Sequence, residues 1–316
     1  MRNFFGQLFD IINPLPYAIS PSFSKSRNGI VLMQWNMLND RDDKDEENEF
    51  ILPKMINGEN VLDWDMRHKR IANNINVHFP DFVTFQEGSK IDDIIGELKN
   101  RYKCIYSTID GTNVGILYNY KKFVRIEFNE VEKKIVMGKF INKNGKEIWI
   151  GSAHLKSGRG IEQERRRLEQ IKIICDFMNG KNNWIMGMDM NTDYGYSSEN
   201  LTLNYLDKWL PNHGGVTSYP EYTTQKIRSF SSRQEAKRGK YSCAVIDRIM
   251  FSSNLKSYST WKYPTKPNID IDEIEKKVKD DEIKFSDDIN MRSQLLPNLF
   301  CPSDHLYVLC DLAEQN

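Results

Sequence analysis

Residues 65–87, DMRHKRIANNINVHFPDFVTFQE, contain the pattern that decides the fold class. In the first part of this stretch the apolar residues are spaced four apart, at Ile71, Ile75 and Phe79. This spacing predicts an amphipathic helix over 65–79, which Pro80 ends. The apolar run 82–85 then predicts a buried strand, and the polar pair Gln86-Glu87 follows it directly. A helix that leads into a short apolar strand is the building unit of an α/β protein.

The same pattern continues along the rest of the chain. A second clear helix is predicted over 161–178 and a shorter one over 91–98. Further strands are predicted at 30–35, 115–118, 134–140, 148–151, 184–186, 245–251 and 306–309. The chain shows no repeat and no Gly/Ser-rich linker. We therefore expect an N-terminal arm over 1–28 and one α/β domain over 29–316, with two packed sheets flanked by helices.

The helix over 161–178 is predicted to be amphipathic. Its inner face should carry four residues: Leu168, Ile171, Cys175 and Met178. Its outer face should carry five charged residues: Glu162, Glu164, Arg165, Arg166 and Glu169.

Composition excludes some partners and compartments. Lys plus Arg and Asp plus Glu number 44 each, so the whole molecule exerts no long-range attraction on a polyanion, and phosphate affinity must come from a local patch. Five widely spaced cysteines without a C-x-x-C pair indicate reduced thiols in a cytoplasmic or nuclear setting. The N-terminus lacks a secretory pattern, and no stretch is apolar enough to span a bilayer. The charged runs 40–49 and 270–288 are expected to be solvated surface.

Polar residues recur where apolar strands end, which is where α/β proteins gather ligand groups. These residues are Asn36, Glu87, His154, Asp189, Asn191, Asp304 and His305. Each has an ordinary alternative, because a lone Asp is often a turn former and a lone His is often structural. Asp247 is harder to explain structurally. It interrupts an apolar strand, where a buried carboxylate is costly unless it is paired, and a histidine is its natural partner.

Taken in order, these motifs resemble those of the endonuclease/exonuclease/phosphatase superfamily. The superfamily patterns are found at Trp35-Asn36, Gln86-Glu87, Ser152-Ala153-His154-Leu155, Asp189-Met190-Asn191, Ile246-Asp247 and Ser303-Asp304-His305. Further segments resemble the branch of nocturnin and the carbon-catabolite-repressor-type deadenylases, at 63–67, 154–170, 222–228 and 302–306. Any one motif is weak evidence, but the ordered set over about residues 29–312 is specific.

The resemblance implies a four-layered α/β sandwich and phosphoester hydrolysis by a metal-activated water. It implies one or two Mg²⁺ ions, for which Mn²⁺ can substitute, with Asn36, Glu87 and Asp304 at the metal. It also implies catalytic roles for His154, Asp189, Asn191, Asp247 and His305. Asp247 would orient His305, and Asn191 and His154 would donate hydrogen bonds to the phosphate. Whether Asp189 or His305 accepts the proton of the attacking water stays open.

Four departures from the family pattern could alter the site. Met188 stands where the pattern has Gly beside Asp189, Gly88-Ser89 follows Gln-Glu, Arg248 follows Asp247, and Gln225 replaces a Trp. None of these changes removes a catalytic group, so we expect an active enzyme rather than a non-catalytic binding module.

The substrate is less clear from sequence. The resemblance implies that Lys156, Arg159 and Arg228 contact substrate phosphates, to which arginine is suited by bidentate hydrogen bonding. The neighbouring Arg165–Arg167 could equally be a solvated helix face. Candidates for stacking on an adenine are Tyr194, Tyr196, Tyr219 and Tyr222. We expect the substrate to be an RNA 3′ end, attacked by a 3′–5′ exoribonuclease of the poly(A)-removing type, or another adenine-containing nucleotide. The alternatives are an NADP(H) 2′-phosphatase, then a 2′,5′-phosphodiesterase or a DNA-repair endonuclease.

Overall fold

The computed structural model describes residues 29–40, 55–56, 59–60, 62–98, 100–109, 111–194, 199–217, 223–227, 241–263 and 301–315. The predicted N-terminal arm, the 270–288 segment and all but the first residue of the 40–49 run lie outside the described residues. No described helix is long and apolar enough to cross a membrane.

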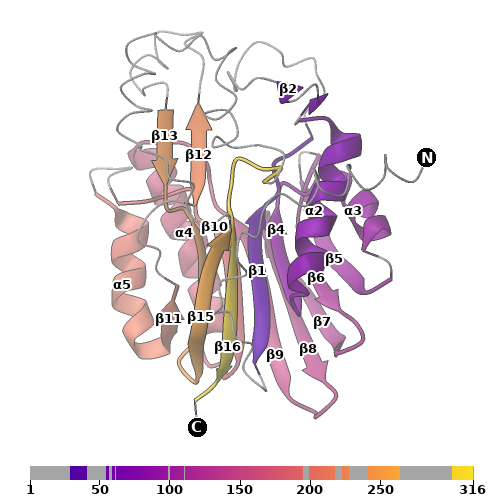
Figure 1. Ribbon diagram of the computed structural model, residues 1–316. Coiled ribbons are helices and arrows are strands. Elements are labelled where there is room, and N and C mark those ends of the chain that lie inside the picture. The colour runs from indigo at the N-terminus through magenta and orange to yellow at the C-terminus, as the bar shows by residue number, and fades with distance from the viewer. Residues whose placement is uncertain are drawn as a thin grey trace, which may run out of the picture.

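Two six-stranded sheets form the centre of the molecule (Figure 1). The first sheet has the order β15 (Leu255–Tyr263), β16 (Tyr307–Glu314), β1 (Ile30–Asn36), β4 (Phe82–Gln86), β6 (Thr112–Asn119), β5 (Tyr102–Ile109). The second has the order β11 (Gly214–Val216), β14 (Asp247–Ser252), β10 (Trp184–Asp189), β9 (Glu147–His154), β8 (Ile135–Asn142), β7 (Phe123–Glu132). Both sheets are mixed, because β1 pairs parallel with β4 and β9 pairs parallel with β10.

The described residues also form two small two-stranded sheets. They are β2 (Met55–Ile56) with β3 (Glu59–Asn60), and β12 (Thr224–Ile227) with β13 (Tyr241–Ala244). In Figure 1 β12 and β13 lie above the large sheets, beyond the end at which β1 and β4 finish.

The helices cover the outer faces of the two sheets. Helices α2 (Trp64–His78) and α3 (Ile91–Glu97) pack on the first sheet, where their apolar residues share a core with Met33, Trp35 and Phe85. Helices α4 (Ile161–Met178) and α5 (Leu201–His213) pack on the second sheet around Met186, Met188 and Met250. A third core lies between the sheets and includes Leu32, Phe82, Ile150 and Ile185. Three cores between four layers confirm the predicted four-layered α/β sandwich.

The period of β1 shows how the sequence specifies these layers. Neighbouring strand residues point to opposite faces, so Leu32 enters the core between the sheets while Val31, Met33 and Trp35 enter the core under the helices. Because both faces are covered, the first four residues of β1 are all apolar and its interior is buried.

The predicted helix over 65–79 is observed one residue earlier, at 64–78. Asp63 caps its start, with its side chain accepting a hydrogen bond from the Asp65 N–H. Phe79 ends it in the left-handed conformation, at φ 48°.

Helix α4 has the predicted bounds, but its predicted outer face is wrong at Glu164. Glu164 and Arg167 are both fully buried, whereas Leu168 is only partly buried. The two charged side chains tolerate burial because they form an ion pair with an N–O distance of 2.8 Å. Asp247 also differs from expectation, since it begins β14 rather than interrupting a strand.

Candidate active site

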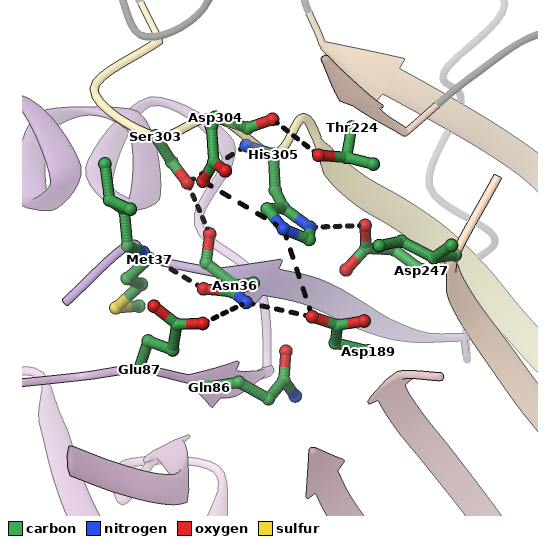
Figure 2. Close-up of polar contacts among 12 residues, drawn as sticks. Asn36, Met37, Gln86, Glu87, Asp189, Thr224, Asp247, Ser303, Asp304 and His305 are labelled. Atoms are coloured by element: carbon green, nitrogen blue, oxygen red, sulfur yellow. Dashed lines mark hydrogen bonds and ion pairs between the residues drawn. The ribbon is translucent and has the colours of Figure 1, made fainter. Parts of the chain in front are cut away.

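The strand ends bring most of the predicted polar residues together. In the first sheet Asn36 lies beside Gln86, the last residue of β4. In the second sheet Asp189 lies between His154 on β9 and Asp247 on β14. The segment before β16 adds Asp304 and His305. Figure 2 shows Asn36, Asp189, Asp247, Asp304 and His305 converging at these strand ends.

The Asn36 side chain is a central link in this cluster. Its amide Nδ2 donates to Glu87 Oε1 at 3.2 Å and to Asp189 Oδ2 at 2.9 Å. Its Oδ1 accepts from the Leu38 N–H at 3.1 Å. In this arrangement Asn36 holds the two carboxylates on either side of its amide, as Figure 2 shows, and its oxygen is engaged by the main chain.

The backbone turn after β4 sets the direction in which the Glu87 side chain points. It has a positive φ of 54°, an uncommon conformation for a residue other than glycine. Its Oε2 accepts from the Asn39 N–H at 3.1 Å, and its side chain remains 20 % exposed. Asp189 is only 1 % exposed. Of the two carboxylates that flank the Asn36 amide, that of Glu87 is accessible and that of Asp189 is buried.

His305 is oriented by Asp247. The ring Nδ1 donates to Asp247 Oδ2 at 2.8 Å, and the opposite nitrogen, Nε2, lies 3.9 Å from Asp189 Oδ2 and 4.0 Å from Asp304 Oδ1. Burial by itself lowers the pKa of His305. The carboxylates of Asp247, Asp304 and Asp189 outweigh burial and raise that pKa to about 9. Burial also raises the pKa of Asp247, so the His305–Asp247 pair retains a proton at neutral pH.

Hydrogen bonds to the main chain hold this pair in place. Ser303 Oγ donates to the Asn36 carbonyl at 2.6 Å and accepts from the His305 N–H at 3.1 Å. Trp35 Nε1 donates to the His305 carbonyl at 3.0 Å. Thr223 Oγ1 accepts from the Asp247 N–H at 3.0 Å. Ser303, Trp35 and Thr223 thus fix the position of the His305–Asp247 pair.

His154 faces the same carboxylates without a hydrogen bond. Its Nε2 lies 3.8 Å from Glu87 Oε1 and 3.6 Å from Asp189 Oδ2. Its Nδ1 is buried and has no hydrogen-bond partner. A structural histidine would be held by hydrogen bonds, so this geometry favours the functional alternative for His154.

Asn191 is joined to the site by its backbone. It has a positive φ of 50°, its N–H donates to Asp189 Oδ1 at 2.8 Å, and its Nδ2 donates to the Leu155 carbonyl at 3.1 Å. Asn191 therefore links the loop after β10 to the loop after β9. Its donation to a phosphate stays a prediction.

The donor set fits a hard metal ion. Ligand atoms of Asp189, Asp247 and His305 lie within 4.8 Å of one another, a group that could hold a metal ion. Carboxylate oxygens of Glu87 and Asp304 lie next to this group. Because His305 Nδ1 and Asp247 are engaged with each other and Mg²⁺ prefers oxygen, the carboxylates of Glu87 and Asp304 are the better ligands.

Two of the three predicted substrate-contacting residues belong to the described part of the chain. Lys156 and Arg159 are exposed on the loop between β9 and α4, and Arg228 lies outside the described residues. Of the four tyrosines, only Tyr194 is described. It is exposed, and its hydroxyl donates to Asp207 at 2.6 Å.

The substitution of Met188 for glycine leaves the site undisturbed. The ladders of β10 with β9 and β14 run without a register shift through Asp189. The Met188 side chain is buried under α4 and α5 instead.

Arg67 was not selected from the sequence as a site residue. It is 1 % exposed, and its Nη1 donates to the carbonyls of Met37 at 3.0 Å and Leu38 at 2.6 Å. Burial lowers its pKa to about 10, opposed by the negative charges of Asp40, Asp304 and Glu87. Arg67 holds the loop after Asn36 and places a positive charge beneath the carboxylates. An arginine four residues after the Asp63 cap was the sequence signal for it.

Comparison with known proteins gives the class of this chain. The model of the Endonuclease/Exonuclease/phosphatase family matches residues 33–305, and the chain belongs to that family. With its buried cluster of Asp189, Asp247 and His305, it is a metal-dependent phosphoester hydrolase.

Particular relatives are more distant. Nocturnin of Xenopus laevis is 23% identical over 330 residues, which cover 93% of this chain and 75% of that protein. The human nocturnin catalytic domain with bound sulfate has a TM-score of 0.57 at 17% identity, covering 92% of this chain and 97% of that one. ANGEL2, a 2′,3′-cyclic phosphatase, has a TM-score of 0.61 at 18% identity, covering 91% and 96%. The predicted superfamily is confirmed.

Proposed function

We propose that this protein is a Mg²⁺-dependent 3′–5′ exoribonuclease of the poly(A)-removing type. The observation that carries the hydrolytic part is the convergence of Glu87 and Asp189 on the Asn36 amide, opposite the ring of His305. The motifs shared with the nocturnin and deadenylase branch support the RNA substrate. The similar ANGEL2, a 2′,3′-cyclic phosphatase solved in complex with adenosine-2′,3′-vanadate, also supports an adenosine-containing substrate.

In this proposal Glu87 and Asp304 hold Mg²⁺, with Asn36 fixing Glu87. The bound ion would polarise the phosphoryl oxygen and lower the pKa of a bound water. Asp189 holds the attacking water and accepts its proton. We assign this role to Asp189 rather than to His305, because the Asn36 amide and the Asn191 N–H hold the Asp189 carboxylate beside Glu87, whereas Asp247 holds His305 as a donor.

The histidines then act as hydrogen-bond donors. His305 Nε2–H donates to a phosphoryl oxygen, while Asp247 fixes the orientation of the ring through Nδ1. His154 Nε2 faces the same space and donates to the developing negative charge. Lys156 and Arg159 are exposed on the loop after Leu155. They would bind the phosphates of the RNA that neighbour the one being cleaved.

A second candidate is an NADP(H) 2′-phosphatase. It is favoured by the match to nocturnin over 93% of this chain. It would use the same hydrolytic residues, with Lys156 and Arg159 bound to the pyrophosphate.

Product identification separates the candidates. The protein is incubated with oligo(A), a mixed-sequence RNA, 2′,5′-oligoadenylate and NADPH, each with and without Mg²⁺. We expect oligo(A) to shorten by single nucleotides with release of AMP. Release of phosphate from NADPH without shortening of oligo(A) would replace the exoribonuclease with the phosphatase.

A further inference from the structure

The buried ion pair between Glu164 and Arg167 on α4 has no assigned role, although both side chains have an exposed fraction of 0%. Arg167 donates from Nε at 3.0 Å and from Nη2 at 2.8 Å to the same oxygen, Oε2, of Glu164. Burial raises the pKa of Glu164, but the Thr202 N–H and Arg167 outweigh it and lower that pKa overall. Glu164 is therefore ionised, and the buried charges are matched.

The remaining contacts of Arg167 go to the loop between β9 and α4. Its Nη1 donates to the Lys156 carbonyl at 2.8 Å and to the Gly158 carbonyl at 2.7 Å. Gln170, one turn further along α4, accepts from the Lys156 N–H at 2.8 Å. Helix α4 thus holds the backbone of Lys156 at both its N–H and its carbonyl, and the Lys156 side chain is left exposed.

The remaining contacts of Glu164 go to the other side of the site. Its Oε2 accepts from Thr192 Oγ1 at 3.2 Å, and its Oε1 accepts from the Thr202 N–H at the start of α5 at 2.8 Å. Thr192 directly follows Asn191, which is hydrogen-bonded to Asp189. One buried pair therefore connects the loop that carries Lys156 to the loop that follows Asp189.

We propose that Glu164 and Arg167 are positioning residues that hold the Lys156–Gly158 loop at a fixed place relative to Asp189, so that this loop binds a substrate phosphate. This inference rests on the proposed function, because it assigns substrate affinity to that site. A buried pair that is fully hydrogen-bonded suits this role, since a planar guanidinium fixes two carbonyls and a carboxylate at once.

The chain supplies a matched control on the same helix. Arg166 and Glu169 form an ion pair with the same spacing, at 3.1 Å, but both side chains are more than 60 % exposed, at 67% and 62%. Arg167→Lys keeps the positive charge but removes the planar guanidinium and its several N–H donors. Arg166→Lys makes the same change in an exposed pair. Gln170→Leu loosens the loop without disturbing the buried pair.

The test measures kcat and KM for oligo(A) with Mg²⁺ and, separately, hydrogen exchange of the amides of residues 155–160. Arg167→Lys and Gln170→Leu should raise KM about tenfold with kcat within about twofold, while Arg166→Lys should change neither constant. In Arg167→Lys and Gln170→Leu, hydrogen exchange should accelerate at residues 155–160. It should stay unchanged in the strands of the second sheet.

Each outcome decides the proposal. Unchanged KM in folded Arg167→Lys, or faster exchange spread over the whole domain, would overturn it. If Arg167→Lys does not fold, Gln170→Leu decides by the same criteria. If the wild type turns over no phosphoester, the proposed function fails, and the exchange measurement alone decides whether the pair holds the loop.

Discussion

At the scale of single residues, the site depends on how charges are balanced in a buried space. Asp189, Asp247 and Asp304 lie around the imidazole of His305, and Glu87 lies with Asp189 at the imidazole of His154. The positive charge of Arg67 lies beneath Glu87 and Asp304. A buried carboxylate without a partner is costly. In the metal-free protein the protonated His305 supplies part of the compensation, and a bound cation would supply the rest.

This balance predicts a pH dependence of stability in chelator-treated protein. His305 has a folded-state pKa of about 9 against an ordinary value of 6.5, so its contribution is complete below about pH 6.5 and is lost as pH rises through about 9. The free energy of unfolding should fall by about 3 kcal/mol across this window, as measured by urea titration.

The control for this prediction is Asp247→Asn, which removes the main charge facing His305 Nδ1. The decrease in the free energy of unfolding between pH 6.5 and 9 should become much smaller in this variant. An equal decrease in both proteins would show that another group causes it.

The residues of the site could be predicted from sequence because polar side chains at the ends of apolar runs are visible there. Their contacts could not. Which atom of Asn36 faces the carboxylates, and how Ser303 holds both Asn36 and His305, depend on contacts across 267 residues. Arg67 was missed because an arginine in an amphipathic helix usually indicates a solvated face.

At the scale of elements, helices were predicted better than strands. Helix α4 has the predicted bounds because its apolar period is long and uninterrupted. Strand β7 was missed because it is an edge strand, and most of its side chains are exposed, including Val124 and Ile126. Helix α5 was missed because Pro211 lies near its end. The miss at β7 has a general cause, because edge strands lack the continuous apolar run by which buried strands are recognised.

The packing of α4 leads to a prediction with an internal control. Ile171 is fully buried under the second sheet, whereas Ile173 on the same helix is 36 % exposed. Ile171→Ala should lower the free energy of unfolding by about 2–5 kcal/mol, and Ile173→Ala by about 0.5 kcal/mol or less, in denaturant titrations. Similar losses for the two variants would contradict the assigned core.

The close approach of the two sheets explains a glycine beneath the site. A Cβ on Gly187 of β10 would lie 2.0 Å from Thr84 Oγ1 on β4. Thr84 and Gln86 hydrogen-bond to Gln34 in a polar network between the sheets. Gln34 in turn donates to Asp247 Oδ1 at 3.3 Å. The small residue therefore lets the ends of β4 and β10 meet, which places Glu87 and Asp189 in one site.

At the scale of the whole molecule, equal numbers of acidic and basic residues mean that substrate is not attracted over a long range. Recognition then depends on the local geometry of the strand ends and of the loop carrying Lys156. The two sheets each supply part of the site, so the site exists only when the sandwich is assembled.

The central claim is that this site hydrolyses a phosphoester with a metal held by Glu87. The most direct test compares wild type, Glu87→Ala and Glu130→Ala, an exposed glutamate on edge strand β7, for oligo(A) hydrolysis after chelation and after Mg²⁺ is restored. We predict that chelation abolishes hydrolysis and that Mg²⁺ restores it in wild type and Glu130→Ala. Glu87→Ala should lose at least about 100-fold in kcat/KM. Hydrolysis that persists in chelator, or that survives intact in Glu87→Ala, would contradict the account.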